Sequence, residues 1–396
     1  MKWILSVLVV VSFYNTFARD IFVGGAGASD TNTGTAAQPF AALQRAASGA
    51  VAGDIVKIRS GTYRETVTPA NPGVTFQPDN GATVIVSGLN EAGNTGWSVH
   101  SGNIYKKTIT LNGNNLYIDN NNTNTTLHAI QIFKDGVMQI QARWPKAGSV
   151  AELFDRNKLR QRNSTQNWQN GVISDSGIPN IPGGWAGGQI WITGWYVSQT
   201  RNITGHSGST VNYQPSHGDL RFLQYYYLTG KLGALTQAKE WHYENNTLYF
   251  WQEGGGSPTG VEYKARNWGF DLRGKANTHV VGLHFSGCDP INADVNSPNT
   301  VVDGTRAKYI NHTFLLTGGG DLYTNARRTG LMIIGENSVL KNSEIQYSAS
   351  QAVWLGEKCR MENNLILDIN YEGNYASGVN LWNPNRSSNQ VVTRNT

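Results

Sequence analysis

A short motif recurs five times in the last third of the chain, and it constrains the fold more than any other feature. The five copies align without gaps: THVVGLHF from residue 278, AKYINHTF from 307, SVLKNSEI from 338, CRMENNLI from 359 and QVVTRNT from 390. Their starts are separated by 29, 31, 21 and 31 residues. Repeats of this size are typical of solenoids, in which each coil packs only on its neighbours.

Two positions of the motif are apolar, so we expect them to face the interior of a coil. The third position holds Val280, Tyr309, Leu340, Met361 and Val392, and the eighth holds Phe285, Phe314, Ile345 and Ile366. Because the gap between the two positions is odd, the alternation of a strand must break once between them. Asparagines stand at that point: Asn311, Asn342, Asn363, Asn364 and Asn395. Since Asn tolerates left-handed backbone, we predict a bend there and a ladder of stacked Asn side chains.

Each coil adds a second strand after the motif. These strands are GLMI from 330, AVWL from 352 and GVNL from 378. The chain has 45 glycines and only 15% charged residues, a composition that disfavours helices and suits short strands joined by turns. The predicted fold class is therefore all-β, a right-handed parallel β-helix.

The N-terminal region supports the same fold. IFVGGAGASDTNTG from Ile21, then QPFAALQRAA, then AGDIVKIRSGTYRETV resembles the start of secreted pectate-lyase-like β-helix proteins. Pro39 can begin a short helix whose apolar side is Leu43, Ala46 and Ala47. We expect this helix to cap the open end of the solenoid.

Residues 98–265 break the rhythm of the coils and contain most of the tryptophans. Two strand-like segments flank Asn245-Asn246, which indicates a β-hairpin. We therefore predict an inserted antiparallel β-rich, sandwich-like domain. A β-helix with such an insertion resembles the layout of glycoside hydrolase families 120 and 141.

The expected organisation has four parts. Residues 1–18 have the charge, apolar run and small-residue end of a signal peptide, which predicts a secreted, extracellular or periplasmic protein. Residues 19–97 form the cap and first coils, 98–265 the insert, and 266–396 the later coils. Because the last copy ends one residue early, we expect a C-terminal truncation with coils missing. No later segment is long enough to span a membrane.

The candidate catalytic residues are carboxylates near the outer face of the coils. Glu344 is expected to point outward, Asp368 lies one coil further on, and Glu372 extends the same loop. A pair of carboxylates at such spacing can perform glycoside hydrolysis. Asp368 would be the nucleophile or base, and Glu344 or Glu372 the proton donor. The alternative is that all three are solvated turn residues.

Aromatic and basic residues are the candidates for sugar binding. Flat indole rings suit the apolar faces of sugars, which favours Trp354 and Trp382 on successive coils and Trp144 in the insert. Arg327 and Arg328 in a long loop could hold a uronate carboxylate, and Arg143 beside Trp144 could line one wall of a cleft. A solvated loop is the alternative for the first two.

The predicted function is a secreted enzyme that hydrolyses a plant or algal polysaccharide or oligosaccharide. Two alternatives stay open: a polysaccharide lyase resembling pectate or alginate lyases, and a non-catalytic glycan-binding surface protein. No cofactor or metal site is predicted, although a lyase could use Ca²⁺. The net charge of +5 without a basic run argues against a nucleic-acid partner.

Overall fold

The computed structural model describes residues 18–111, 130–161, 171–193, 198–215, 225–312, 330–373, 376–381 and 389–396. The predicted signal peptide lies outside this part, except for Ala18. Among the described residues the secondary structure is almost entirely β, with one α-helix, α1 (Leu43–Gly49), and short 3-10 turns at Ala151–Phe154, Arg156–Lys158 and Leu232–Ala234. The prediction of an all-β protein is confirmed.

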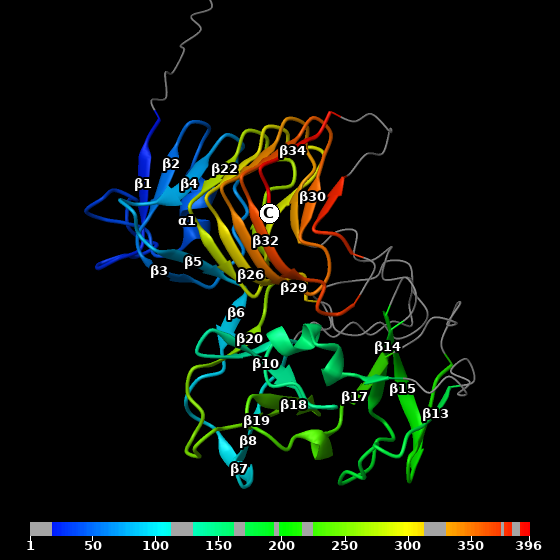
Figure 1. Cartoon of the computed structure of the whole chain (residues 1–396). Helices are drawn as coiled ribbons and strands as arrows, with labels where there is room; N and C mark the ends of the chain where they lie inside the picture. Colours follow the sequence, from blue (N-terminus) through cyan, green and yellow to red (C-terminus); the bar gives the residue numbers. More distant parts are fainter. Residues whose placement is uncertain are drawn as a thin grey trace, which may run out of the picture.

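Stacked coils build three sheets whose neighbouring strands all run parallel (Figure 1). The first sheet contains β1 (Asp20–Val23), β2 (Ile55–Ile58), β4 (Thr75–Pro78), β22 (His279–Val281), β25 (Val301–Asp303), β28 (Val339–Lys341), β31 (Arg360–Glu362) and β34 (Val391–Thr393). The second contains β3 (Gly61–Tyr63), β5 (Val84–Ser87), β23 (His284–Ser286), β26 (Arg306–Ile310), β29 (Glu344–Ser348) and β32 (Leu365–Ile369). The third contains β21 (Trp268–Asp271), β24 (Asp289–Ala293), β27 (Leu331–Ile333), β30 (Val353–Leu355) and β33 (Val379–Leu381).

The strand register confirms four of the five copies of the motif and corrects one. The column of the first sheet runs Val280, Val302, Leu340, Met361, Val392, each residue opposite the next. The copy assigned to AKYINHTF from 307 is therefore wrong, and TVVDGTRA from 300 takes its place. Tyr309 instead has left-handed backbone, with φ 60°, and packs edge-on against Phe133 of the insert. An aromatic residue at a matching spacing imitated the repeat, but it lies near the end of β26 and packs on the insert.

The bend between the two inward positions has the left-handed backbone that the asparagines predict. Asn342 has φ 52° and Asn363 has φ 55°. Their side chains form a ladder, because Asn363 Nδ2 donates to Asn342 Oδ1 at 2.9 Å and Asn342 Nδ2 donates to Asp303 Oδ1 at 2.8 Å. A second column joins Asn364 to Asn395 at 2.8 Å. Asn311 lies elsewhere, where its amide donates to Gln351 O.

The interior of the coils is one continuous apolar cluster, and α1 closes its N-terminal end. Leu43, Ala46 and Ala47 are fully buried in this cluster, as the apolar side of the predicted helix requires. The carboxylate of Glu65 accepts the N–H groups of Leu43 at 2.9 Å and Gln44 at 2.8 Å. It therefore satisfies the exposed amides at the start of the helix.

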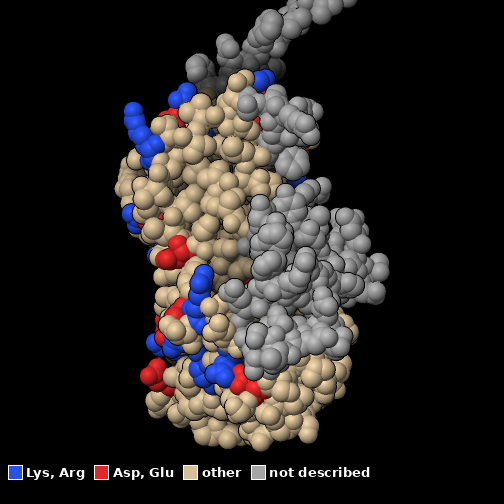
Figure 2. Space-filling view, turned by 45° about the vertical axis from the view of Figure 1, so that its right-hand side comes forward, with Lys and Arg blue, Asp and Glu red and all other residues tan. Residues whose placement is uncertain are grey.

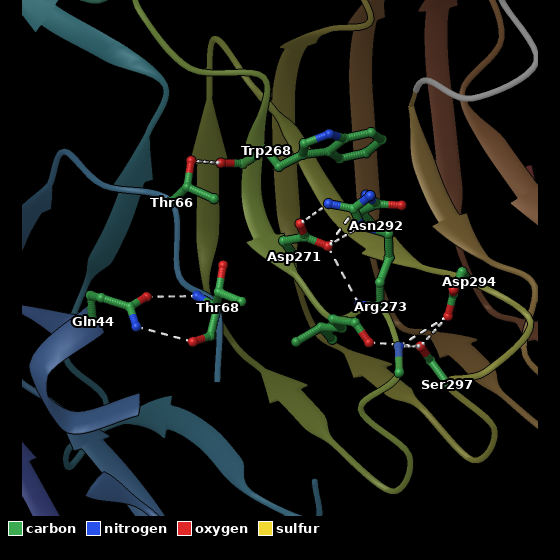
Figure 3. A network of polar contacts seen from close by, with 11 residues as sticks. Gln44, Thr66, Thr68, Trp268, Asp271, Arg273, Asn292, Asp294 and Ser297 are labelled. Atoms are coloured by element: carbon green, nitrogen blue, oxygen red, sulfur yellow. Dashed lines mark hydrogen bonds and ion pairs between the residues drawn. The ribbon is translucent and has the colours of Figure 1, made fainter. Parts of the chain in front are cut away.

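The insert lies in the sequence between two coils that are neighbours in the structure. Thr75 on β4 is opposite His279 on β22, although about two hundred residues of sequence lie between them. A second contact joins the segments on either side of the insert: Thr66 Oγ1 donates a hydrogen bond of 2.7 Å to the carbonyl of Trp268 (Figure 3). The coils thus stack directly across the insertion.

Two mostly antiparallel sheets lie below the coils in Figure 1, and all their strands except Leu89–Glu91 come from the insert. The first is ordered β6 (Leu89–Glu91), β20 (Val261–Lys264), β9 (Ile132–Lys134), β10 (Val137–Gln141), β18 (Glu240–Glu244), β19 (Thr247–Trp251), β8 (Ile104–Thr108) and β7 (Ser98–Ser101). The second is ordered β11 (Arg143–Trp144), β17 (Tyr225–Thr229), β14 (Gln189–Thr193), β15 (Ser198–Ser207), β16 (Thr210–Tyr213) and β13 (Val172–Ser174), with β12 (Arg160–Gln161) also on β17. β18 and β19 form the predicted hairpin, with Asn245 and Asn246 at positive φ.

Charged groups help to join the insert to the coils. Arg64, in the coil region, contacts Glu91 on β6 at 3.0 Å and Glu262 on β20 at 2.6 Å. Figure 2 shows basic and acidic side chains intermixed down one edge of the molecule, with mostly uncharged surface elsewhere on the described part of that face. None of the described helices has the length and apolar character needed to cross a bilayer.

Candidate active site

A cavity lies where the insert meets the coils. It is partly open to solvent, and the space within it amounts to about 600 Å³ with the open solvent included. The insert contributes most of its wall, and the coil side contributes His312, Tyr371 and Glu372. The described wall residues of the insert are Ile130, Gln131, Met138, Gln139, Ile140, Gln141, Arg143, Leu153, Leu159, Trp191, Tyr227 and Trp241. An apolar and aromatic pocket with a few polar groups is the usual form of a small-molecule site.

Glu372 is the acidic residue in the described wall, and it is one of the three carboxylates predicted from the sequence. It lies in the turn after β32, where its N–H donates to Ala349 O at 3.1 Å. Its side chain is only 8% exposed. Its Oε1 has no hydrogen-bond partner among the described residues. A carboxylate in such a place lacks the solvation that favours ionisation.

Burial therefore raises the pKa of Glu372 well above its ordinary range, although the positive charge of Lys264 opposes the rise. Such an acid keeps its proton at a pH where ordinary carboxyls are ionised. Lys264 is itself buried on β20, and burial lowers its pKa while nearby Asp289 raises it. Asp289 is fully buried and accepts the N–H of Asn311 at 2.6 Å. Lys264 therefore interacts electrostatically with two buried acids, Asp289 and Glu372.

His312 and Tyr371 stand beside the acid. His312 Nδ1 lies 2.7 Å from the Tyr371 hydroxyl, a hydrogen bond, and 3.7 Å from Glu372 Oε1. Burial lowers the pKa of His312 well below its ordinary value, and burial raises that of Tyr371. Both groups are therefore neutral near pH 7. They can offer hydrogen bonds to a substrate without carrying charge.

The insert contributes a cross-strand aromatic pair to the wall. Trp191 on β14 is opposite Tyr227 on β17, and their rings stack with centroids 4.9 Å apart and planes 19° apart. The guanidinium carbon of Arg143 lies 3.8 Å from the centre of the Tyr227 ring. Arg143 also donates to the carbonyls of Pro145 and Lys158, at 3.0 and 2.7 Å. Burial lowers the pKa of Arg143 to about 10, so it remains a cation at neutral pH.

The other two predicted carboxylates lie outside this wall. Glu344 is half-buried on β29, with its Oε2 3.8 Å from Arg306 Nε. Asp368 is exposed at the end of β32, and its Oδ2 accepts a hydrogen bond of 2.9 Å from Gln346. The structure thus brings Glu372 into the cavity and leaves Glu344 and Asp368 on the coil surface. Their predicted pairing has no counterpart in the geometry of the cavity.

Of the residues predicted to bind sugar, Arg143 alone lines the cavity within the described part of the chain. Trp144 packs against the core of the insert, where its ring lies near Tyr226. Trp354 points away from the coil interior, between the inward Val353 and Leu355, but is 4% exposed and presents no open ring face. Trp382, Arg327 and Arg328 lie outside the described residues.

Comparisons with known proteins show a shared fold. No protein-family profile and no curated protein matches the sequence. Two solved structures are similar: that of XylC in complex with xylose, with TM-score 0.51 and 16% identity, and one described as a glycoside hydrolase, with TM-score 0.54 and 12% identity. The first similarity covers 91% of this chain and 56% of XylC, and the second covers 96% of both chains. This chain has the fold of XylC. The chain spans little more than half of the length of XylC.

Several wall residues had no clear signal in the sequence. Tyr371 and Tyr227 were not singled out, and His312 appeared only as part of the misassigned copy AKYINHTF. Trp191 was one of many tryptophans in the insert, most of which core packing explains. A pairing across more than a hundred residues of sequence brings these side chains together, and local spacing does not reveal it.

The arrangement fits a reaction that needs a proton donor of low solvent exposure. A neutral carboxylic acid can protonate a leaving oxygen, and aromatic walls suit the apolar faces of sugar rings. In the described part of the chain, no three His, Cys, Asp or Glu side chains gather as a metal site would require.

Proposed function

We propose that the protein is a carbohydrate-active enzyme that hydrolyses glycosidic bonds, with Glu372 as the proton donor. The observation that carries this proposal is the buried Glu372 carboxyl in the cavity between the insert and the coils. In glycoside hydrolysis the donor must be protonated at the working pH, and burial achieves this by raising its pKa.

The fold adds a second line of support. XylC, which shares the fold, is described in complex with xylose, and the other similar structure is described as a glycoside hydrolase. We therefore propose a saccharide substrate, with a sugar ring bound in the cavity beside Glu372. One fold can host different reactions, so the site must decide between them.

The second carboxylate of the reaction is the less defined part of the proposal. Asp368, four residues before Glu372 on the same coil, is the candidate nucleophile or base that the sequence favours. Its exposed position requires the substrate to extend from the cavity across the end of β32. Glu344 is the weaker candidate, because its nearest charged partner is Arg306 on the preceding strand.

We further propose that the coils form a right-handed parallel β-helix of the pectate-lyase-like superfamily with an inserted β-sandwich. The three parallel sheets and the adjacency of β4 and β22 across the insert support this assignment. With the signal-like N-terminus, the protein would be secreted and would meet its saccharide outside the cell.

A glycan screen tests the proposed function. The protein is incubated with plant and algal polysaccharides and oligosaccharides, and the masses of the products are measured by mass spectrometry. Hydrolysis adds one water for each bond cleaved and produces new reducing ends. Products without added water that absorb ultraviolet light would instead establish a lyase. Binding without cleavage would establish a glycan-binding protein.

Variants then test the assigned residues on any substrate that is cleaved. Glu372→Gln removes the proton while keeping the size of the side chain, and it should lower kcat by about 10²- to 10⁴-fold. Asp368→Asn should cause a loss of similar size if Asp368 is the second carboxylate. Glu344→Gln should be nearly neutral. Full activity in Glu372→Gln would overturn the assignment of the donor.

A further inference from the structure

Glu372 lacks the hydrogen bonds that normally hold a catalytic carboxyl in place. Its Oε1 has no hydrogen-bond partner among the described residues. The His312 Nδ1 atom lies 3.7 Å from this oxygen. That distance is too long for a hydrogen bond. The position of the carboxyl must therefore come from its backbone and from packing around the turn that bears it.

The coil fixes one side of this turn through the backbone. The N–H of Glu372 donates to Ala349 O at 3.1 Å, and the N–H of Gly373 donates to Asn370 O at 3.0 Å. Asn370 is in turn tied to Ser348 O at 2.7 Å. These bonds fix the backbone of the turn on the side that faces the coil. The other side of the turn must be held by different contacts.

The insert covers that other side with Trp191. A Cβ added at Gly373 would lie 3.1 Å from Cζ2 and 3.4 Å from Cη2 of the Trp191 ring. Contacts near 3.1 Å are too close for a carbon atom in normal packing. Gly373 also has φ +67°, a backbone conformation that a residue with a side chain rarely adopts. The ring thus lies directly on the backbone of the residue that follows the acid.

Trp191 is itself held firmly. It is 8% exposed, and it stacks on Tyr227, its partner on the neighbouring strand. Arg143 contacts the Tyr227 ring and is anchored by two backbone carbonyls. A ring supported by two strands of a sheet is a rigid surface against which a turn can rest.

We infer that Trp191 is a positioning residue for Glu372: the insert holds the proton donor in place by packing this ring on Gly373. This inference rests on the proposed function. It gives the insert a catalytic purpose beyond forming a wall. It also explains why the turn has glycine at the position after the acid, since any side chain there would push the ring away.

The test uses the full chain and the substrate found by the glycan screen. Trp191→Ala should lower kcat on the order of ten- to a hundredfold, because displacements of about 1 Å at a catalytic group have such effects. KM should change less than kcat. Water entering the space left by the ring should solvate the carboxylate, so the alkaline limb of the pH profile of kcat should move to lower pH. Trp191→Phe keeps an aromatic ring and should restore most of kcat and the limb.

A matched control separates positioning from general damage. Trp251 is another partly buried tryptophan that packs on the core of the insert but does not line the cavity. Trp251→Ala should leave the alkaline limb in place, even if it lowers the melting temperature as much as Trp191→Ala does.

The Gly373→Ala variant tests the contact from the other side. Gly373→Ala should lower kcat and move the alkaline limb of the pH profile in the same direction as Trp191→Ala does. The effects of the two substitutions should be less than additive, because both disturb the same contact. Unchanged kcat and pH profile in Trp191→Ala, while Glu372→Gln is inactive, would overturn the inference and leave the proposed function standing. An active Glu372→Gln would overturn the proposed function itself.

Discussion

The carboxyl of Glu372 and the imidazole of His312 face each other across 3.7 Å, on turns that belong to different coils. Both side chains are 8% exposed, and burial drives both toward their neutral forms. The pair therefore gains little from charge attraction, and the fold holds an acid in surroundings that disfavour its ionised form. This strain on the ionised form has consequences for stability and for pH dependence.

Glu372→Gln should stabilise the protein at neutral pH. The pKa of Glu372 is higher in the folded state than the ordinary value of 4.5. The folded state thus retains a proton that the unfolded chain has lost, so the free energy of unfolding falls as pH rises from 4.5 toward the folded pKa. Removing the group should raise the free energy of unfolding at pH 7. Denaturant unfolding at pH 4 and pH 7 measures it, with no gain expected at pH 4. A loss of stability at pH 7 would contradict the account.

Activity should decline on the alkaline side when Glu372 loses its proton, at a pH above the ordinary range of glutamate. Lys264→Met should move this limb to still higher pH, because the lysine charge opposes the raised pKa. The Asp289 charge that Lys264 offsets would act in the same direction. The pH profile of kcat, measured for the wild type and for Lys264→Met, gives the position of the limb in each. Circular dichroism first shows that the variant is folded. A limb that moves to lower pH in Lys264→Met would argue against Glu372 as the titrating group.

Leu340→Ala should destabilise the coils strongly. Leu340 is fully buried between Val302 and Met361 in the inward column of the first sheet. Removing a buried leucine side chain costs about 2–5 kcal/mol. Val392 occupies the same column at its last coil but is 48% exposed, so Val392→Ala should cost under about 1 kcal/mol. Equal losses in denaturant unfolding would mean that the column is not buried as described.

The insert should depend on a different kind of interaction. Lys146 Nζ contacts the Glu240 carboxylate at 2.8 and 3.0 Å, and Glu240 is fully buried. Lys146→Met leaves that carboxyl without its partner and should destabilise the protein by about 3 kcal/mol. Adding Glu240→Gln should recover part of the loss, since the buried charge is gone. Thermal unfolding of the single and double variants tests this, and a double variant less stable than Lys146→Met would count against it.

Much of the coil architecture was predictable because a solenoid repeats its chemistry locally. The column of Leu340, Met361 and Val392 and the bends at Asn342 and Asn363 follow from spacing alone. Tyr309 was misassigned because its spacing matched the motif, whereas the true member, Val302, sits seven residues earlier. A single sequence does not distinguish a residue that faces the coil interior from a strand residue that packs on a distant part of the chain.

The site was less predictable for a physical reason. Glu372 was recognised only as a carboxylate near Asp368, since nothing in its neighbourhood indicates burial. That burial comes from the insert, whose Trp191 and Tyr227 are brought to the turn by tertiary packing. The burial that raises the pKa of Glu372 is therefore a property of the junction, which local sequence does not encode.

The most direct test of the central claim is the dependence of the Glu372→Gln defect on the leaving group. Aryl glycosides of the sugar released from the natural substrate are compared. Their phenol leaving groups range from unsubstituted phenol, a poor leaving group, to dinitrophenol, a good one. A good leaving group departs without a proton, so the variant should be slow on the poor leaving groups and close to wild type on dinitrophenol. A defect of the same size across the whole series would show that Glu372 does not donate the proton.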